Sequence, residues 1–294
     1  MWESVRADLA VAALMPAIAL AAAWITAGAR LRRGSGFALG LLVLAPPWLA
    51  APPILRGIFC LLGALAVMRL VDLVREPHEL PVRARLWHVV SPADSRTLRP
   101  GPRTLDARGL GVALLWAATS LAALWLAARP GQGLAVRWAE GLVTVYGFVE
   151  ALWGSVGVAY RLLGFEPPLL HANPVASRSI AKLWGARWSL PVSRWVDRNA
   201  LRPLARRGWP QAGVAAAFLC SAIIHAYAAL AGAGLAMAGL MLGYFLLQGV
   251  LVLLERPLGV ARWPRAAAHA WVLGVMVATS PLFVEPFLRA VGIA

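Results

Sequence analysis

Residues 211–254 read QAGVAAAFLCSAIIHAYAALAGAGLAMAGLMLGYFLLQGVLVLL, and this run indicates the fold class most clearly. It contains no Asp, Glu, Lys or Arg, and it is long enough for two helices that each cross a membrane in about 20 residues. The same window, moved outward along the chain, predicts eight spans. They cover residues 9–27, 37–54, 57–74, 109–128, 138–160, 209–231, 235–254 and 266–287.

The composition of the whole chain leads to the same fold class. Hydrophobic residues make up 60%, charged residues only 14%, and the mean hydropathy is +0.70, unlike soluble globular domains. Because backbone groups in lipid must be hydrogen-bonded, and these runs are too long for barrel strands, the spans are predicted to be helical. We therefore predict an all-α, polytopic transmembrane protein in which residues 1–294 form a single membrane-embedded domain. Pro46, Pro47, Pro52 and Pro53 are expected to kink the second span or end it early.

Basic residues lie between the apolar runs and predict the orientation. In the eight-span order, 22 Lys and Arg residues fall on one side of the membrane and five on the other. The basic side is expected to be cytoplasmic and the N-terminus outside, in a bacterial inner membrane. Loops that face anionic lipid or an anionic cofactor account for the net charge of +15, so the lipid bilayer is an expected partner and nucleic acid is not.

Two long basic segments, residues 75–108 and 161–208, are therefore predicted to lie in the cytoplasm. The second is rich in Trp and Arg at helix-compatible spacing, which predicts an amphipathic helix at the membrane interface. Its aromatic residues are Trp184, Trp188 and Trp195, and its basic residues include Lys182, Arg187, Arg194 and Arg198.

The cysteines and most histidines give no indication of a metal or disulfide. Cys60 and Cys220 each lie inside an apolar run, so packing is their expected role. The other histidines, at positions 78, 88, 171 and 269, do not form a metal-ligand spacing. We predict no metal site.

His225 is the most informative single residue, because it lies near the middle of a predicted span. An ionisable side chain at that depth is costly to bury and is a candidate functional group. A neutral imidazole can accept a proton near pH 7, which suits a general base. A histidine hydrogen-bonded between helices is the structural alternative.

The stretch upstream of His225 resembles a known signature. Residues 184–199 read WGARWSLPVSRWVDRN, and basic residues continue to Arg207. This resembles membrane-bound O-acyltransferases, in which a tryptophan-rich cytoplasmic helix with a Trp-Asn-x-Pro-Val core precedes a span with the catalytic histidine. The preceding segment, NPVASRSI at 173–180, is most similar to the wax-synthase-like branch. The resemblance is sharp over residues 173–232, and Ser189 stands where the family usually has asparagine.

The resemblance implies an acyltransferase that joins an acyl group, expected to be long-chain, from acyl-CoA to a lipophilic alcohol. His225 would be the general base, and Ser189 would take the place of the asparagine, directly or through water, unless Asn173 or Asn199 substitutes for it. Acyl-CoA would be a substrate, with no permanently bound cofactor. The residues expected to contact substrates are Trp184, Arg187, Trp188, Arg194, Asn173 and Glu150.

Two other functions remain open. A short-chain O-acetyltransferase acting on a sugar or glycan would share the same residues, and the size of the pocket would distinguish it. A transporter or passive membrane scaffold would explain the spans and charges equally well, but would leave the Trp-Ser-x-Pro-Val stretch and His225 unexplained. The sequence carries no information on oligomeric state.

Overall fold

The computed structural model describes residues 2–28, 30–76 and 80–293, so His78 lies outside the described residues. The described chain is mainly helical with almost no strand, and seven of its helical segments are long and apolar enough to cross a membrane. The all-α, polytopic prediction is therefore confirmed. These segments are α1 (Trp2–Ile25), α3 (Pro53–Arg75), α5 (Ala107–Ala127), α6 (Leu134–Leu162), α10 (Pro210–Ala233), α11 (Leu235–Glu255) and the pair α12 (Arg265–Thr279) and α13 (Pro281–Ala290).

The chain divides into two compact units, which are described separately. The first contains Met1–Leu98 and Tyr227–Leu235, and the second contains Arg99–Ala226 and Ala236–Ala294. All the residues that the sequence singles out as a candidate site belong to the second unit.

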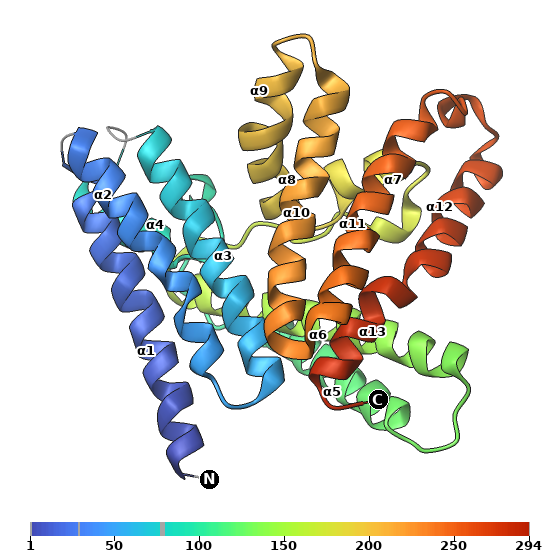
Figure 1. Cartoon of the computed structure of the whole chain (residues 1–294), viewed down its shortest axis with the longest axis horizontal. Coiled ribbons are helices and arrows are strands. Elements are labelled where there is room, and N and C mark those ends of the chain that lie inside the picture. The colour runs from blue at the N-terminus through green and yellow to red at the C-terminus, as the bar shows by residue number, and fades with distance from the viewer. Residues whose placement is uncertain (1, 29, 77–79, 294) are drawn as a thin grey trace. The chain divides into compact units, whose positions relative to one another are not determined.

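The predicted second span, residues 37–54, is not a continuous helix. The chain forms α2 (Arg30–Leu41) and then two 3-10 turns, η1 (Leu42–Leu44) and η2 (Pro46–Leu49). Prolines lack the amide proton that an α-helix needs, which explains the early end. The segment still runs antiparallel to α1 (Figure 1), and the Ala51 amide donates to the Asp8 carboxylate at 2.8 Å. It therefore returns to the N-terminal part of α1 as a broken crossing.

Buried charges hold α4 (Val82–Val90) and η3 (Ser95–Thr97) against α3 in the first unit. The carboxylate of Asp72 lies 3.0 Å from the guanidinium of Arg96, 3.4 Å from the imidazole of His88 and 3.8 Å from Arg69. Burial alone would raise the pKa of Asp94, but its bonds to Arg96 hold that pKa well below the usual range. Arg69 and Asp72 are thus part of a larger ionic network.

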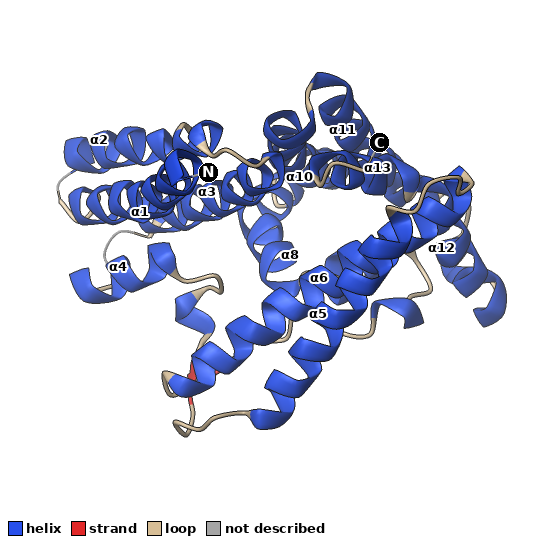
Figure 2. Cartoon of the chain, turned by 90° about the horizontal axis from the view of Figure 1, so that it is seen from below, coloured by secondary structure: helices blue, strands red, loops and turns tan. Residues whose placement is uncertain are grey.

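In the second unit, α5 and α6 lie side by side along their length (Figure 2). A Cβ at Gly147 would lie 3.1 Å from the Trp116 carbonyl oxygen, so glycine allows this close approach. Ser120 Oγ donates to the Thr144 carbonyl at 2.8 Å. Two short antiparallel strands, β1 (Arg99–Pro100) and β2 (Phe165–Glu166), pair at the end of this hairpin, beyond the C-terminus of α6.

The basic segment of the second unit is not the single amphipathic helix that the Trp and Arg spacing predicts. It breaks at Trp188 and Ser189, where Ser189 adopts the left-handed conformation with φ of 41°. A left-handed residue cannot continue a right-handed helix, so the direction of the chain changes there. The segment consists of α7 (Ile180–Lys182), the π-helical η5 (Leu183–Arg187), α8 (Leu190–Val196), the π-helical η6 (Asp197–Leu201) and α9 (Arg202–Ala205). The remaining 3-10 turns are η4 (Pro174–Ala176) and η7 (Val260–Arg262).

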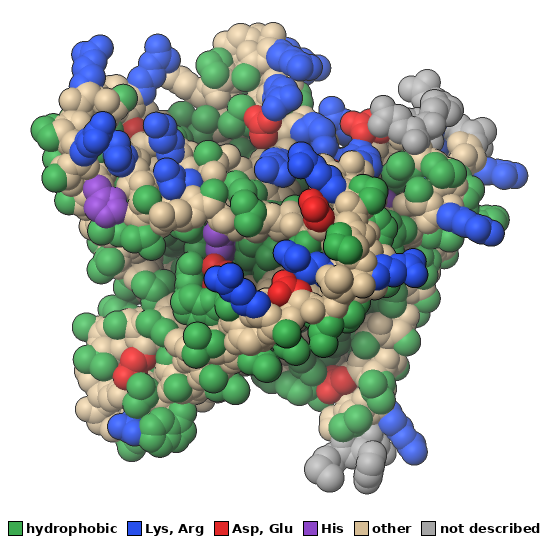
Figure 3. Space-filling view, turned by 180° about the vertical axis from the view of Figure 1, so that it is seen from behind, with side chains coloured by type: hydrophobic (Ala, Val, Ile, Leu, Met, Phe, Trp, Pro, Cys, Tyr) green, Lys and Arg blue, Asp and Glu red, His purple; other side chains and the backbone are tan. Residues whose placement is uncertain are grey.

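The surface fits a lipid environment. Large hydrophobic side chains on the long helices are exposed, including Trp24, Leu115 and Val277, each more than 60% accessible. Figure 3 shows widely exposed hydrophobic side chains on the surface. Together with the seven long apolar segments, this makes the chain an integral, multi-pass membrane protein.

Candidate functional site

The candidate site is built on two segments that pair side by side, residues 170–173 and 187–190. The Ala172 amide donates to the Arg187 carbonyl, and the Leu190 amide donates to the Leu170 carbonyl, both at 2.8 Å. Asn173 is also left-handed, with φ of 51°. Within the described residues, Asn173 and Ser189 are the two residues other than glycine with positive φ, and both were predicted site residues. Such backbone strain is often found at functional sites.

Arg187 locks the two segments together. Its Nη1 donates to the Ala172 carbonyl at 3.0 Å and to the Asn173 carbonyl at 2.8 Å. Arg194, by contrast, is exposed on α8. The sequence predicts that both arginines contact substrates, and this stays a prediction; Arg187 is engaged with backbone carbonyls, whereas Arg194 is exposed.

His171 connects the locked segments to α6. Its Nδ1 accepts a hydrogen bond from the Ser189 amide at 3.1 Å, and its ring stacks on Trp188 with 4.2 Å between centroids. On the other side, His171 Nε2 lies 3.6 Å from Oε1 of Glu150. Burial lowers the pKa of His171 to about 4, by more than the neighbouring Leu170 backbone raises it, so the imidazole is neutral at pH 7.

Trp184 occupies the centre of an aromatic cluster. Its ring lies edge-on to Trp188 at 6.2 Å and tilted to Phe245 at 6.0 Å. Its Nε1 donates to Oε1 of Gln248 at 3.1 Å, and Nε2 of Gln248 donates to Thr279 at 2.9 Å. Because Gln248 is fully buried, this chain of hydrogen bonds fixes the orientation of the Trp184 ring.

His225 lies in the interior of α10, with its ring 4.3 Å from that of Phe245. Its Nδ1 lies 2.8 Å from the Ser221 carbonyl oxygen. A carbonyl oxygen only accepts, so in the neutral imidazole Nδ1 carries the proton and Nε2 is left as the proton acceptor. Through Phe245, Trp184 and Trp188, a continuous series of ring contacts joins His225 to His171.

Glu255 anchors the beginning of the basic segment. Its carboxylate accepts from the amides of Ile180 and Ala181 at 2.6 and 3.0 Å, and from Nε1 of Trp271 at 3.1 Å. A carboxylate there satisfies amides that have no partner within α7. The carboxylate thereby holds the start of the Trp184 segment against α11 and α12.

The structure thus brings together most of the predicted residues. Trp184, Arg187, Trp188, Ser189 and Asn173 lie in or beside the locked segments, Glu150 joins them through His171, and His225 joins them through Phe245. Arg194 lies apart on the exposed side of α8. The Asn199 side chain donates to the Trp195 carbonyl at 3.0 Å, a contact within its own helical segment.

Sequence reasoning missed His171, Gln248 and Glu255. Gln248 carried a usable signal, since a polar side chain inside an apolar run needs a partner. His171 was considered only as a metal ligand, although it lies two residues before the signature segment. Among the described residues, no group of three or more His, Cys, Asp or Glu is arranged to hold a metal ion, and the absence of a metal remains a prediction.

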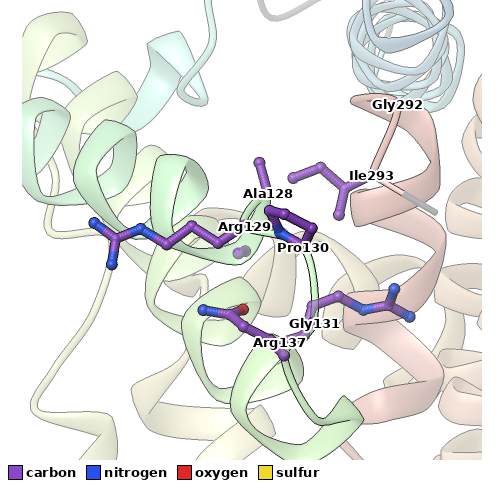
Figure 4. Close-up of a pocket in the computed structure, with 9 residues that line it drawn as sticks. Ala128, Arg129, Pro130, Gly131, Arg137, Gly292 and Ile293 are labelled. Atoms are coloured by element: carbon purple, nitrogen blue, oxygen red, sulfur yellow. The ribbon is translucent and has the colours of Figure 1, made fainter.

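A cavity of about 380 Å³ lies between the α5–α6 loop and the C-terminal residues (Figure 4). Arg129 and Arg137 line it, but their guanidinium groups point in opposite directions. Arg129 stacks over Trp125 at 4.0 Å, and Arg137 pairs with Glu285 at 3.3 Å. No predicted site residue lines this cavity, which is separate from the candidate site.

Comparison with known proteins adds no assignment, because no protein-family model matches the chain and no curated protein matches it.

Proposed function

We propose that this membrane protein is an O-acyltransferase that moves a fatty acyl group from acyl-CoA to the hydroxyl of a lipophilic alcohol. The observation that carries the proposal is the tautomer of His225. Its Nδ1 proton is directed at the Ser221 carbonyl, so Nε2 carries a lone pair. The rings of Phe245 and Phe283 lie beside the imidazole, in the interior of a membrane span. A base of this kind suits a substrate hydroxyl in an apolar setting.

In the proposed reaction, Nε2 of His225 takes the proton of the acceptor hydroxyl as its oxygen attacks the thioester carbonyl. The new ester forms, the carbon–sulfur bond breaks, and coenzyme A leaves as a thiolate that takes up the proton. No enzyme nucleophile is needed. Proton transfer to a positioned base contributes roughly 100- to 10,000-fold to the rate of such a step.

The strained turn at Ser189 supports the placement of the acyl donor. Its hydroxyl makes no capping bond to the helix that follows, so it is available to hold a carbonyl oxygen. The neighbouring π-helical segments η5 and η6 support a functional role for this region, since π-helical turns are rare and frequent at functional sites. Exposed basic residues such as Arg194 and Arg178 could contact the phosphates of coenzyme A.

The proposal is tested by supplying purified protein in detergent with labelled palmitoyl-CoA or acetyl-CoA. A long-chain alcohol and a sugar serve as alternative acceptors, and the products are separated by lipid chromatography. We expect palmitoyl ester of the long-chain alcohol, with coenzyme A released in equal amount. Acetylated sugar as the main product would replace the long-chain assignment by short-chain transfer. No ester from any combination, with no binding of coenzyme A, would contradict the proposal.

A further inference from the structure

His171 has a hydrogen-bonding pattern that specifies one protonation state. Its Nδ1 accepts the Ser189 amide proton at 3.1 Å, so Nδ1 has no proton of its own. A neutral imidazole then carries its proton on Nε2. That nitrogen is buried, has no hydrogen-bond partner among the described residues, and lies 3.6 Å from Oε1 of Glu150. The carboxylate therefore faces the only proton on the ring.

The surroundings favour this arrangement over the alternatives. A protonated ring would turn an Nδ1 proton toward the Ser189 amide, placing two donors against each other. Trp188 covers the ring at 4.2 Å, and Tyr146 stacks at 6.1 Å. The Tyr146 hydroxyl interacts with the side chain of Glu150, four residues further along the same helix. Tyr146 and Glu150 are thus the polar groups of α6 that face the imidazole.

Ser189 needs such support because its backbone is strained. The left-handed conformation costs about 1–2 kcal/mol for a residue with a side chain, and it persists only where the surroundings determine it. The amide of Ser189 is held by His171, and its carbonyl accepts from the Ser193 amide at 2.9 Å. The bond from His171 is the one that reaches Ser189 from outside its own helix.

We propose that His171 is a positioning residue that holds Ser189 in the conformation needed to contact the acyl carbonyl, and that Glu150 selects the His171 tautomer which makes this possible. This inference rests on the proposed acyl transfer for its consequence, but its structural part is independent of any activity. Glu150 thereby acts through His171, and is reassigned from the substrate contact that the sequence predicts.

The first test measures protonation directly, by nitrogen-15 NMR of the full-length protein labelled at its five histidines. We expect His171, assigned by its loss in His171→Asn, to be protonated on Nε2 and His225 on Nδ1. The variant Glu150→Leu is expected to shift His171 toward the Nδ1 tautomer, whereas Glu140→Leu, on the same helix, leaves it unchanged. An Nδ1 proton on His171 in the parent, or no response to Glu150→Leu, would overturn the proposal.

The second test separates positioning from packing by comparing His171→Asn with His171→Phe. The Asn side chain places an oxygen near the position of Nδ1 but loses the stack on Trp188, while Phe keeps the stack and loses the acceptor. If His171 positions Ser189, kcat in His171→Asn exceeds that in His171→Phe by about tenfold, the worth of one hydrogen bond, with KM for palmitoyl-CoA similar in both.

A kcat in His171→Phe equal to or above that in His171→Asn would reduce His171 to a packing role and overturn the proposal. If the parent protein forms no ester, the proposed acyl transfer fails by itself. The NMR comparison then decides the His171–Glu150 assignment alone, so the two failures are distinguishable.

Discussion

At the residue scale, hydrogen bonds determine the chemistry of the two histidines of the candidate site. The imidazoles of His171 and His225 are both held at Nδ1, but one accepts from an amide and the other donates to a carbonyl. The same nitrogen, Nε2, therefore carries a proton on His171 and a lone pair on His225. Only the second can remove a proton from a substrate, which is why we assign catalysis to His225 and positioning to His171.

The low pKa of His171 predicts a pH dependence of stability. Burial lowers the pKa of the folded state to about 4, while an unfolded histidine titrates near 6.5. Above pH 6.5 both states are neutral and the group has no effect. As pH falls from 6.5 toward 4, the unfolded state binds the proton first, so folding is weakened, by up to about 3 kcal/mol below pH 4.

The measurement is the difference in unfolding temperature of detergent-solubilised protein between pH 7.5 and pH 5. His171→Asn is expected to reduce this difference, because the titrating group is gone. His269→Asn serves as the control, since His269 is another partly buried histidine, with its Nδ1 3.1 Å from the Ser177 carbonyl oxygen. A pH difference in His171→Asn as large as that of the parent would place the acid sensitivity elsewhere.

The sequence predicted most of the residues that come together at the candidate site, but not all of them. Trp184, Trp188 and Ser189 lie close together in the sequence within a recognisable pattern, and the structure brings them together. The bond between His171 and the Ser189 amide depends on a left-handed turn, and no local propensity predicts that turn at a serine. Arg187 was predicted to contact a substrate, and that contact stays a prediction; in the structure its Nη1 donates to the backbone carbonyls of Ala172 and Asn173.

At the scale of elements, the strained turn between η5 and α8 leads to a prediction about stability. Ser189→Gly removes the Cβ that disfavours the left-handed conformation, and should raise stability by about 1 kcal/mol. Ser155→Gly replaces an exposed serine inside α6 and should lower stability by up to about 1 kcal/mol. We expect the two substitutions to change the free energy of unfolding, measured with a chemical denaturant, in opposite directions. Two changes of the same sign would mean that Ser189 is not held in a strained turn.

Some helical elements could be predicted from the sequence, and others could not. The other predicted runs became helices close to their predicted positions, because length and hydropathy determine them in a membrane. The residues 37–54 failed as a helix at their prolines, as the sequence allowed. The Trp and Arg spacing of 182–198 predicted one interfacial helix. That prediction was wrong because the spacing of side chains does not show that one residue, Ser189, has a left-handed backbone that ends the helix.

The whole molecule has an orientation that the charges predict. The segment after α2 returns beside α1, so we still count it as one membrane crossing. With that count, the Lys and Arg distribution predicts that the segment 161–208 faces the cytoplasm. With Cys60 and Cys220 replaced by Ala, single cysteines at exposed positions report the side. A membrane-impermeant thiol reagent should label Ala128→Cys in intact cells, and Arg207→Cys only after permeabilisation. The reverse pattern would invert the orientation and exclude cytoplasmic acyl-CoA as the donor.

The proposed role of His225, removal of the proton of the acceptor hydroxyl, is tested by comparing ester formation by three proteins. These are the parent, His225→Ala and Cys220→Ala, a control on the same helix. We predict that His225→Ala lowers kcat at least about 100-fold while Cys220→Ala stays within about twofold of the parent, with both variants folded and inserted. Ester formation by His225→Ala at the rate of the parent would contradict the account.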